Sequence, residues 1–337
     1  MSSQLYTPRN ILVTGGAGFI GSNFIHFLLR ENKKIKIVNL DSLTYAGSLK
    51  NLEGLPDPLR YEFVRGTICD PKVVNETLRR YDIDTIIHFA AESHVDRSID
   101  GPAAFVQTNV VGTFALLEAA KQFWLTEKKY DKTECRFHHV STDEVYGALN
   151  LGDSPFTEKT AYAPNSPYSA SKAASDHLVR AYHRTYGLPA TMSQCSNNYG
   201  PRQHSEKLIP TIIRSCRSRQ PIPVYGNGAN IRDWLYVDDH CAAILAILER
   251  GEVGETYAIG GHTELDNLSV AHFICDLMGE LYPQAESHRS LIQFVKDRPG
   301  HDFRYAIDSS KISSELGWQP KETFKTGIRK TVEYYKK

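Results

Sequence analysis

The sequence has no excess of charge of either sign and no long apolar run. Lysine plus arginine and aspartate plus glutamate both number 39 among 337 residues, which leaves no overall field to hold nucleic acid or an anionic membrane. No uninterrupted apolar stretch approaches the ~20 residues of a membrane span, and the polar start of the chain leads directly into a predicted strand. We therefore expect a cytoplasmic protein without a nucleic-acid or membrane partner, in which local charges bind any anionic ligand.

Paired cysteines are also missing. Six cysteines are scattered through the chain without a C-x-x-C pair or a spacing suited to zinc: Cys69, Cys135, Cys195, Cys216, Cys241 and Cys275. They predict reduced, mostly buried thiols and no metal site. Low-complexity segments and internal repeats are likewise absent, and a length of 337 residues favours one large unit with a lobe, or two unequal domains.

Short β-branched runs alternate with helical periodicity along the first two hundred residues. Residues 10–14 form a predicted strand that stops at Gly15, and apolar residues recur at helical spacing from Ile20 onward. Further strands are expected at residues 35–40, 61–65, 85–89, 136–141 and 190–195, and helices at residues 73–81, 103–123 and 166–186. This alternation predicts an α/β fold with a doubly wound parallel sheet of Rossmann type.

The pattern loosens after Pro201, where basic and proline-containing segments are separated by two helical stretches. We interpret residues 1–200 as a dinucleotide-binding sheet domain and residues 201–337 as mainly a smaller C-terminal substrate-binding lobe over the carboxyl edge of the sheet. Residues 233–249 could pack back on the sheet as easily as on the lobe.

The segment TGGAGFIG places Gly15, Gly18 and Gly21 between the first strand and the first helix. Such a loop gives a tight turn and a close approach of backbone N–H groups to a pyrophosphate at the helix start, although glycines also end strands for structural reasons alone. Asp41 ends the next strand, where a carboxylate would bind ribose hydroxyls and repel a 2′-phosphate. The spacing favours NAD over NADP, whereas Asp41 alone could be a solvated acid or a turn cap.

Tyr168 and Lys172 lie four residues apart in SPYSASKAASDHLV, so a helix would direct both side chains from one face. A tyrosine titrates near pH ~10 in water, and an adjacent ammonium together with a cationic nicotinamide ring would favour its phenolate. Tyr168 could then accept a hydroxyl proton as hydride leaves the carbon. The same spacing arises by chance where a surface tyrosine covers a lysine stem, but the glycine loop and STDEVYG argue against chance.

STDEVYG follows the apolar strand FHHV and places Thr142, Asp143 and Glu144 at the carboxyl end of a strand, where open α/β sheets bind ligands. Two carboxyl groups in unlike surroundings can hold different protonation states, one as acid and the other as base. The alternative is an ordinary solvated loop after the strand.

Longer motifs extend these short ones from Asn10 to nearly the end of the chain. They are TGGAGFIGSN, LDSLTYAG, HFAAESHVDRSIDGPAAF, STDEVYG, SPYSASKAASDHLV, CSNNYGP, EKLIP, GNG with IRDWLYV, GETYAIGG, DRPGHDFRYAID and LGW. With them the chain resembles the extended short-chain dehydrogenase/reductase superfamily and, within it, the dTDP-glucose 4,6-dehydratase family. The acidic pair in STDEVYG separates this family from related epimerases.

The resemblance implies oxidation of a sugar C4 hydroxyl by NAD, loss of water across C5 and C6, and return of the hydride at C6. It implies that Tyr168 is the base for the C4 hydroxyl, Lys172 its modulator and ribose ligand, and Thr142 a hydrogen-bond partner of the sugar. Asp143 would protonate the departing C6 oxygen, and Glu144 would take the C5 proton. A C4 ketone acidifies the C5 hydrogen, so temporary oxidation permits the elimination.

The resemblance also assigns binding residues and, commonly, a homodimer formed through helices such as those at Ala103 and Ser166. Residues expected to bind NAD are Gly15, Gly18, Phe19, Ile20, Gly21, Asp41, Ser42, Leu43, Thr44, Thr67, Ile68, Phe89, Ala90, Ala91, Ser93, Thr108, Tyr168, Lys172 and Asn198. Residues expected to bind the nucleotide sugar are Ser93, Thr142, Asn197, Lys207, Leu208, Pro223, Val224, Tyr225, Arg232, Asn267, Asp297, Arg298 and His301. The cations of this second set would hold the diphosphate, although each alone is typical of a solvated surface.

Three positions depart from the family pattern. Thr67 stands where Asp is usual beside the adenine, Gln194 where Arg or Asn is usual, and Ser205 where Pro is common. A 4-epimerase or decarboxylase of the same superfamily would share the glycine loop, Tyr168 and Lys172 but not the adjacent acids. An alternative of another class is an NAD-binding module without catalytic activity. Such a protein would not need Tyr168 or Lys172, and both residues are present here. The nucleotide base and the pathway stay open.

Overall fold

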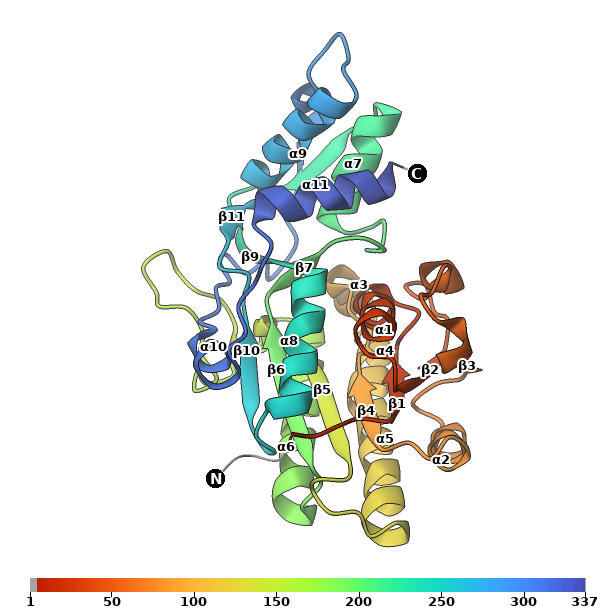
Figure 1. Ribbon diagram of the computed structural model, residues 1–337. Helices are drawn as coiled ribbons and strands as arrows, with labels where there is room; N and C mark the ends of the chain where they lie inside the picture. The colour runs from red at the N-terminus through yellow and green to blue at the C-terminus, as the bar shows by residue number, and fades with distance from the viewer. Residues whose placement is uncertain (1–4, 337) are drawn as a thin grey trace.

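A parallel sheet of seven strands forms the centre of the computed structural model, which describes residues 5–336 (Figure 1). The strand order is β10-β6-β5-β4-β1-β2-β3, and it reverses direction between β1 and β4, so the predicted doubly wound sheet is confirmed. The strands are β1 (Asn10–Thr14), β2 (Lys36–Asp41), β3 (Tyr61–Arg65), β4 (Thr85–His88), β5 (Arg136–Thr142), β6 (Ala190–Cys195) and β10 (Thr256–Ile259).

Helices cover both faces of this sheet because its strands are apolar on both sides. In β1, Leu12 faces one hydrophobic core, whereas Ile11 and Val13 face the other, as the two-residue period of a strand requires. The first core is covered by α2 (Pro71–Arg80), α5 (Thr113–Ala120) and α6 (Pro167–Tyr186), and the second by α1 (Phe19–Glu31) and α8 (Val237–Arg250).

The helix predicted at residues 103–123 runs from Pro102 to Glu127 and is not uniformly α-helical. After the short α3 (Val95–Asp100), α4 (Pro102–Phe105) and α5 alternate with π-helical segments at Val106–Gly112 and Lys121–Glu127. By length and composition alone this segment of 26 residues could cross a membrane, but half of its apolar window is buried. Leu116, Leu117 and Trp124 pack in the first core of the sheet, which accounts for the apolar character.

A smaller lobe lies above the carboxyl edge of the large sheet (Figure 1). Its strands form a three-stranded sheet in the order β11-β9-β7 and a parallel pair of β12 with β8. Its hydrophobic core includes Trp234, Ile274 and Ile328. The elements are β7 (Asn197–Tyr199), α7 (Leu208–Ser218), β8 (Ile222–Tyr225), β9 (Ile231–Tyr236), β11 (Glu264–Asp266), α9 (Asn267–Leu281), β12 (Ile292–Val295) and α11 (Phe324–Tyr335), and short 3-10 turns lie at Leu49–Leu52, Pro58–Arg60, Asp143–Tyr146 and His288–Leu291.

The chain passes between sheet and lobe several times, so parts of residues 201–337 pack on the large sheet. α8 packs against α1, and β10 extends the large sheet beside β6. α10 (Ser310–Leu316) packs in turn on α8 and β10. The sequence pattern does not predict β10, because TYAI is too short to carry a period and its pairing with β6 is remote in sequence.

Candidate active site

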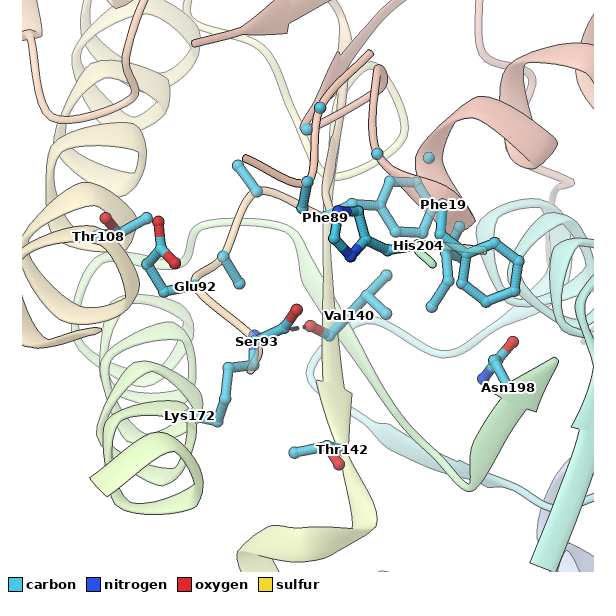
Figure 2. A pocket seen from close by; sticks show the side chains of 18 of the residues that line it. Phe19, Phe89, Glu92, Ser93, Thr108, Val140, Thr142, Lys172, Asn198 and His204 are labelled. Carbon is cyan, nitrogen blue, oxygen red and sulfur yellow. Dashed lines mark hydrogen bonds between the residues drawn. The ribbon is translucent and has the colours of Figure 1, made fainter. Parts of the chain in front are cut away.

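A cavity of about 570 Å³ lies at the carboxyl edge of the large sheet, and residues after β6 such as Asn198 and His204 line part of it (Figure 2). All five predicted catalytic residues line it: Thr142, Asp143, Glu144, Tyr168 and Lys172. The other predicted cofactor residues that line it are Gly15, Gly18, Phe19, Ile20, Gly21, Asp41, Ser42, Thr44, Thr67, Ile68, Phe89, Ala90, Ala91, Ser93, Thr108 and Asn198. Segments that are far apart in the sequence therefore meet in one cavity.

Close backbone packing explains two glycines at the start of α1. Gly15 has a φ of +70°, and a Cβ there would lie 2.7 Å from backbone atoms of Ala90. A Cβ on Gly21 would lie 2.4 Å from the carbonyl oxygen of Gly15. α1 begins after Gly18, which has no side chain to cap the first turn. The first N–H groups of the helix therefore have no side-chain acceptor and are available to bind an anionic group of a ligand.

Asp41 ends β2 inside the cavity and is 7 % exposed. Its carboxylate accepts hydrogen bonds from the backbone N–H groups of Ala17, at 2.9 Å, and Leu43, at 2.7 Å. Burial raises the pKa of Asp41, and these two amides oppose the rise. Leu43 does not line the cavity, in contrast to the prediction, and serves instead to orient Asp41. Each carboxylate oxygen still has a lone pair for a ribose hydroxyl.

Tyr168 and Lys172 project from the first turns of α6, which Ser166 caps. Burial raises the pKa of Tyr168 well above its usual value, Glu144 adds to the rise, and a hydrogen bond with Thr142 opposes it. Lys172, predicted to lower this pKa, projects from the same helix, and its amine donates to a backbone carbonyl of β5 at 2.9 Å. Burial lowers the pKa of Lys172 to about 8.

Asp143 and Glu144 follow β5 and have unlike surroundings. Asp143 is 2 % exposed, and its Oδ2 has no hydrogen-bond partner within residues 5–336. Burial raises the pKa of Asp143 well above its usual value, and the charge of Glu144 adds to the rise. Burial also raises the pKa of Glu144, but the positive charges of Arg298, Arg232 and Lys207 oppose it. Asp143 therefore holds a proton more tightly than Glu144 does, so the pair offers one acid and one base.

Three cations act on Glu144, and burial withdraws two of them, Lys207 and Arg232, from water. Burial lowers the pKa of Lys207 and of Arg232, and Arg232 is only 5 % exposed. Arg298 lies 3.4 Å from Asp96, while its buried Nε has no partner in the part of the chain that the structure describes. Buried positive charge of this kind is suited to a phosphate or diphosphate.

The remaining residues predicted to bind the nucleotide sugar divide between the cavity and the lobe beside it. Ser93, Asn197 and Lys207 line the cavity, whereas Leu208, Pro223, Val224, Tyr225, Arg232, Asn267, Asp297, Arg298 and His301 lie outside it. Val224 is 1 % exposed in the lobe core, so its side chain cannot meet a ligand. The Tyr225 hydroxyl donates to Asp96 at 3.3 Å, and His301 lies 2.6 Å from Asp297. These contacts extend the site from α3 towards β8 and β12.

Several cavity residues fall outside the predicted set, among them Val140, Cys195, Gln203 and His204. Val140 and Cys195 lie near the carboxyl ends of β5 and β6, so strand ends are the signal that could have found them. Gln203 and His204 belong to the loop after Pro201, and no residue spacing marks them as ligands. Figure 2 shows His204 and Val140 among the side chains that face the cavity.

The departures from the family pattern have different surroundings. Thr67 lines the cavity, and its hydroxyl accepts from the N–H of Cys69 at 3.2 Å. Gln194 is buried in β6, where its amide donates to Asp176 at 3.2 Å. Ser205 lies outside the cavity. Only the first of these positions can therefore touch a cofactor directly.

Comparisons with known proteins agree with this geometry. A sequence model of the family described as GDP-mannose 4,6 dehydratase matches residues 12–331. The dTDP-glucose 4,6-dehydratase of Salmonella typhimurium is 55% identical over 333 residues, which are 96% of this chain and 92% of that protein. DesIV (dTDP-glucose 4,6-dehydratase) of Streptomyces venezuelae, solved with NAD and TYD bound, has a TM-score of 0.88 at 45% identity, with 97% of each chain covered. A UDP-glucose 4-epimerase of Thermotoga maritima has a TM-score of 0.84 at 27% identity, covering 97% of this chain and 98% of that one.

The glycine loop makes a prediction about stability. We expect Gly21→Ala to lower the free energy of unfolding by about 1–3 kcal/mol, because the new methyl group would overlap the Gly15 carbonyl. Gly279 lies in α9 with open space around it, so the control Gly279→Ala should raise the free energy of unfolding by about 0.5–1 kcal/mol. Urea denaturation followed by circular dichroism measures both. Equal effects of the two substitutions would contradict the role given to Gly21.

Proposed function

The chain belongs to the nucleotide-sugar dehydratase family whose sequence model matches residues 12–331, and we propose that it is an NAD-dependent dTDP-glucose 4,6-dehydratase. It converts dTDP-glucose to dTDP-4-keto-6-deoxy-glucose by transient oxidation at C4, elimination of water across C5 and C6, and return of hydride to C6. The relatives of that name, one of them solved with NAD and TYD bound, support this activity.

The observation that carries the proposal is the unlike pair Asp143 and Glu144. Elimination of water needs an acid for the departing C6 oxygen and a base for the C5 proton. Burial raises the pKa of Asp143 well above its usual value, whereas at Glu144 three cations oppose the rise that burial causes. An epimerase inverts the configuration of one carbon and eliminates no water, so it does not require such an acid–base pair. The similarity in fold to a UDP-glucose 4-epimerase therefore does not favour that reaction.

NAD is the cofactor, and the cavity fits a dinucleotide. Gly15 and Gly21 allow the tight backbone packing at the start of α1 that a Cβ would prevent, and Asp41 presents a fixed carboxylate for ribose hydroxyls. Because Asp41 is buried, a 2′-phosphate there would place two negative charges together with little water to screen them. When bound, NAD supplies reversible acceptance of hydride from the sugar.

Tyr168 takes the proton of the C4 hydroxyl, with Thr142 and Lys172 beside it. Burial and Glu144 hold the pKa of Tyr168 high, so the phenol acts as a base only while positive charge is near. Lys172, which lines the same cavity, provides that charge as an ammonium. Once C4 is a ketone, the C5 hydrogen is acidic enough for Glu144 to remove it. Asp143 then gives its proton to the C6 oxygen, which leaves as water.

Substrate binding uses the lobe. Lys207, Arg232 and Arg298 bind the diphosphate, and their position around Glu144 places the sugar next to the acid pair. The predicted residues of β8 and of the loop after β12 then lie where the nucleoside would extend. Tyr225 and His301 form an edge-to-face aromatic pair there, with ring centroids 6.2 Å apart, and offer apolar surface to a base.

Assembly and location form a further part of the proposal. Val106, Val111 and Phe114 on the helical segment Pro102–Glu127 are 52%, 40% and 47% exposed. Large apolar side chains grouped on one helix are typical of a subunit contact, so we infer a homodimer formed through this segment and α6. A cytoplasmic location is consistent with six cysteines that are all free thiols.

The activity itself is the first test of the proposal. Purified protein with bound NAD should convert dTDP-glucose to a product lighter by one water, without added reductant, as detected by mass spectrometry. UDP-glucose and GDP-glucose should react at least about tenfold more slowly in kcat/KM if contacts to the base contribute to recognition. Equal kcat/KM values for the three nucleotide glucoses would contradict the assignment of thymidine as the preferred base. Lack of product from every nucleotide glucose would contradict the dehydratase activity.

The division of labour between the acids predicts the behaviour of Glu144→Gln. We expect kcat to fall by about a hundredfold or more, because the base for the C5 proton is lost while Tyr168 remains. Quenched reactions should contain a C4-oxidised sugar that keeps its C6 oxygen. Glu62→Gln, at an exposed acid of β3, is the control and should leave kcat unchanged. Full turnover by Glu144→Gln would remove Glu144 from the mechanism.

The subunit contact is tested by Phe114→Glu. A carboxylate in an apolar interface should weaken dimerisation by about tenfold or more, which sedimentation velocity over a range of concentrations would measure. Leu59→Glu is the matched control, because Leu59 is 96% exposed in a different segment, and it should leave the dimer intact. A monomeric wild-type protein, or a Phe114→Glu variant that dimerises like wild type, would refute the proposed interface.

A further inference from the structure

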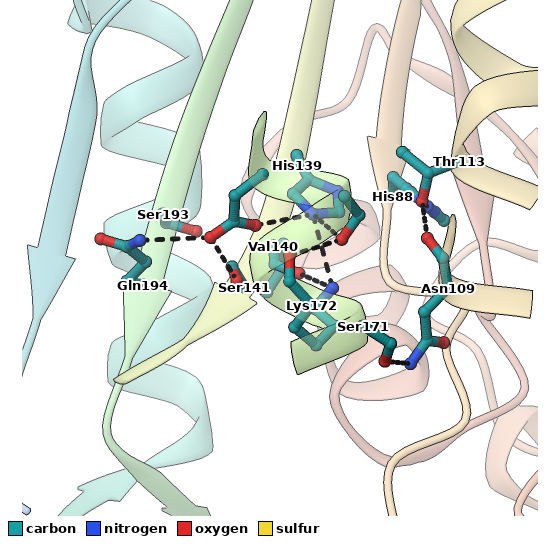
Figure 3. Close-up of polar contacts among 12 residues, drawn as sticks. His88, Asn109, Thr113, His139, Val140, Ser141, Ser171, Lys172, Ser193 and Gln194 are labelled. Carbon is teal, nitrogen blue, oxygen red and sulfur yellow. Dashed lines mark hydrogen bonds and ion pairs between the residues drawn. The ribbon is translucent and has the colours of Figure 1, made fainter. Parts of the chain in front are cut away.

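A buried polar network holds Lys172 from behind the cavity and is not used in the mechanism above (Figure 3). The Lys172 amine donates to the carbonyl oxygen of Val140 at 2.9 Å and lies 3.5 Å from Nε2 of His139, both in β5. The same imidazole nitrogen lies 3.1 Å from Oδ1 of Asp176. Asp176 is four residues after Lys172 in α6, so the two side chains leave the same face of the helix and both approach His139 of β5.

The carboxylate of Asp176 is held in place by several donors. It is 1 % exposed, and its Oδ2 accepts from the Ser141 hydroxyl at 2.9 Å, the Tyr162 hydroxyl at 2.9 Å and the Gln194 amide at 3.2 Å. Burial opposes ionisation, but His139 and the other partners outweigh it, so the pKa of Asp176 is lowered. Asp176 is therefore a fixed negative charge in the protein interior.

The other titratable groups that face this network are uncharged at neutral pH. They are His88 from β4, His139 from β5, Cys195 from β6, and Tyr146 and Tyr162 from the segments after β5. Burial lowers the pKa of His139 to about 4 and raises the pKa of Cys195 to about 12. Asp143 and Glu144 act on Tyr168 rather than on the Lys172 amine. Among the residues described, Asp176 supplies the negative charge that faces Lys172.

We propose that Asp176, acting through His139, is a positioning residue for Lys172: it fixes the lysine side chain against β5 and keeps its ammonium charged beside Tyr168. The inference rests on the proposed function, because it assigns a reason for the charge that Tyr168 needs as a base. Asp176 makes no contact with the cavity itself and belongs to the support of the site.

The consequence is a dependence on pH. Burial lowers the pKa of Lys172 to about 8, and Asp176 opposes this fall. Lys172 is therefore charged at pH 7 and loses its proton as the pH rises through about 8. Without the carboxylate of Asp176, the proton is lost at a lower pH, and catalysis is lost with it. The alkaline side of the activity profile thus reports on Asp176.

The test compares Asp176→Asn with wild-type protein, both with NAD bound. We expect the alkaline midpoint of kcat/KM for dTDP-glucose to move down by about one pH unit or more, with the smallest change in rate at acidic pH. Asp84→Asn is the matched control, because Asp84 is also a buried, hydrogen-bonded acid but lies at the amino end of β4. It should not move the midpoint. A uniform loss of activity at every pH in Asp176→Asn would reduce Asp176 to a structural role and overturn the inference.

A second readout does not depend on turnover. The ¹³C signal of the Lys172 side chain, assigned by its loss in Lys172→Arg, follows protonation of the amine directly. The midpoint of this titration should be lower in Asp176→Asn than in wild-type protein. If Lys172 titrates with the same midpoint in both proteins, the inference is overturned, whether or not dTDP-glucose is converted. Absence of conversion by wild-type protein with a shifted titration would contradict only the proposed function.

A pair of variants at Gln194 tests the same charge without removing Asp176. Gln194→Arg places a guanidinium beside the carboxylate, which should offset its field and move the alkaline midpoint down by less than Asp176→Asn does. Gln194→Met removes the hydrogen bond at 3.2 Å but adds no charge, so it should leave the midpoint unchanged. Equal midpoints for the two Gln194 variants would overturn the inference.

Discussion

Burial of charge at the carboxyl edge of the seven-stranded sheet is the constraint on which the rest of the site depends. Asp143, Lys172 and Asp176 are each at most 4 % exposed, and an ionised group in such a place is costly unless a partner compensates it. The three are compensated differently. Burial raises the pKa of Asp143 well above its usual value, Asp176 is surrounded by donors, and Lys172 lies near Asp176. Because little water reaches these groups to screen their charges, neighbouring residues determine their pKa values.

The sheet and the lobe contribute different parts of this electrostatic arrangement. The strand ends carry the groups that exchange protons, whereas Arg232 and Lys207 come from the lobe and act on Glu144. The sheet therefore carries the groups that exchange protons, and the lobe carries cations that change the pKa of one of them. A UDP-glucose 4-epimerase shares this fold, with a TM-score of 0.84 at 27% identity, so the fold alone does not determine the reaction.

Local patterns in the sequence predict much of this, and interactions remote in sequence do not. The glycine loop, Asp41 and the segment 142–144 lie within single strand-turn units, so residue spacing alone places them at one edge of the sheet. The high pKa of Tyr168 depends on burial and on Glu144, which only the folded chain brings close. The contact of His139 with Asp176 likewise joins a strand to a helix and has no signature in the sequence. β10 is missed for the same reason, because a strand of four residues is defined by its partner.

The repeated passage of the chain between sheet and lobe has a consequence for how the molecule can be divided. A fragment that stops after β6 would lack α8 over one face of the sheet and β10 at its edge, and would expose Ile11, Val13 and Phe24 of the second core. The complementary fragment would carry α8 and β10 with no sheet to join. Neither piece would keep the complete sheet with both of its faces covered, so we expect cleavage after β6 to destabilise the sheet domain.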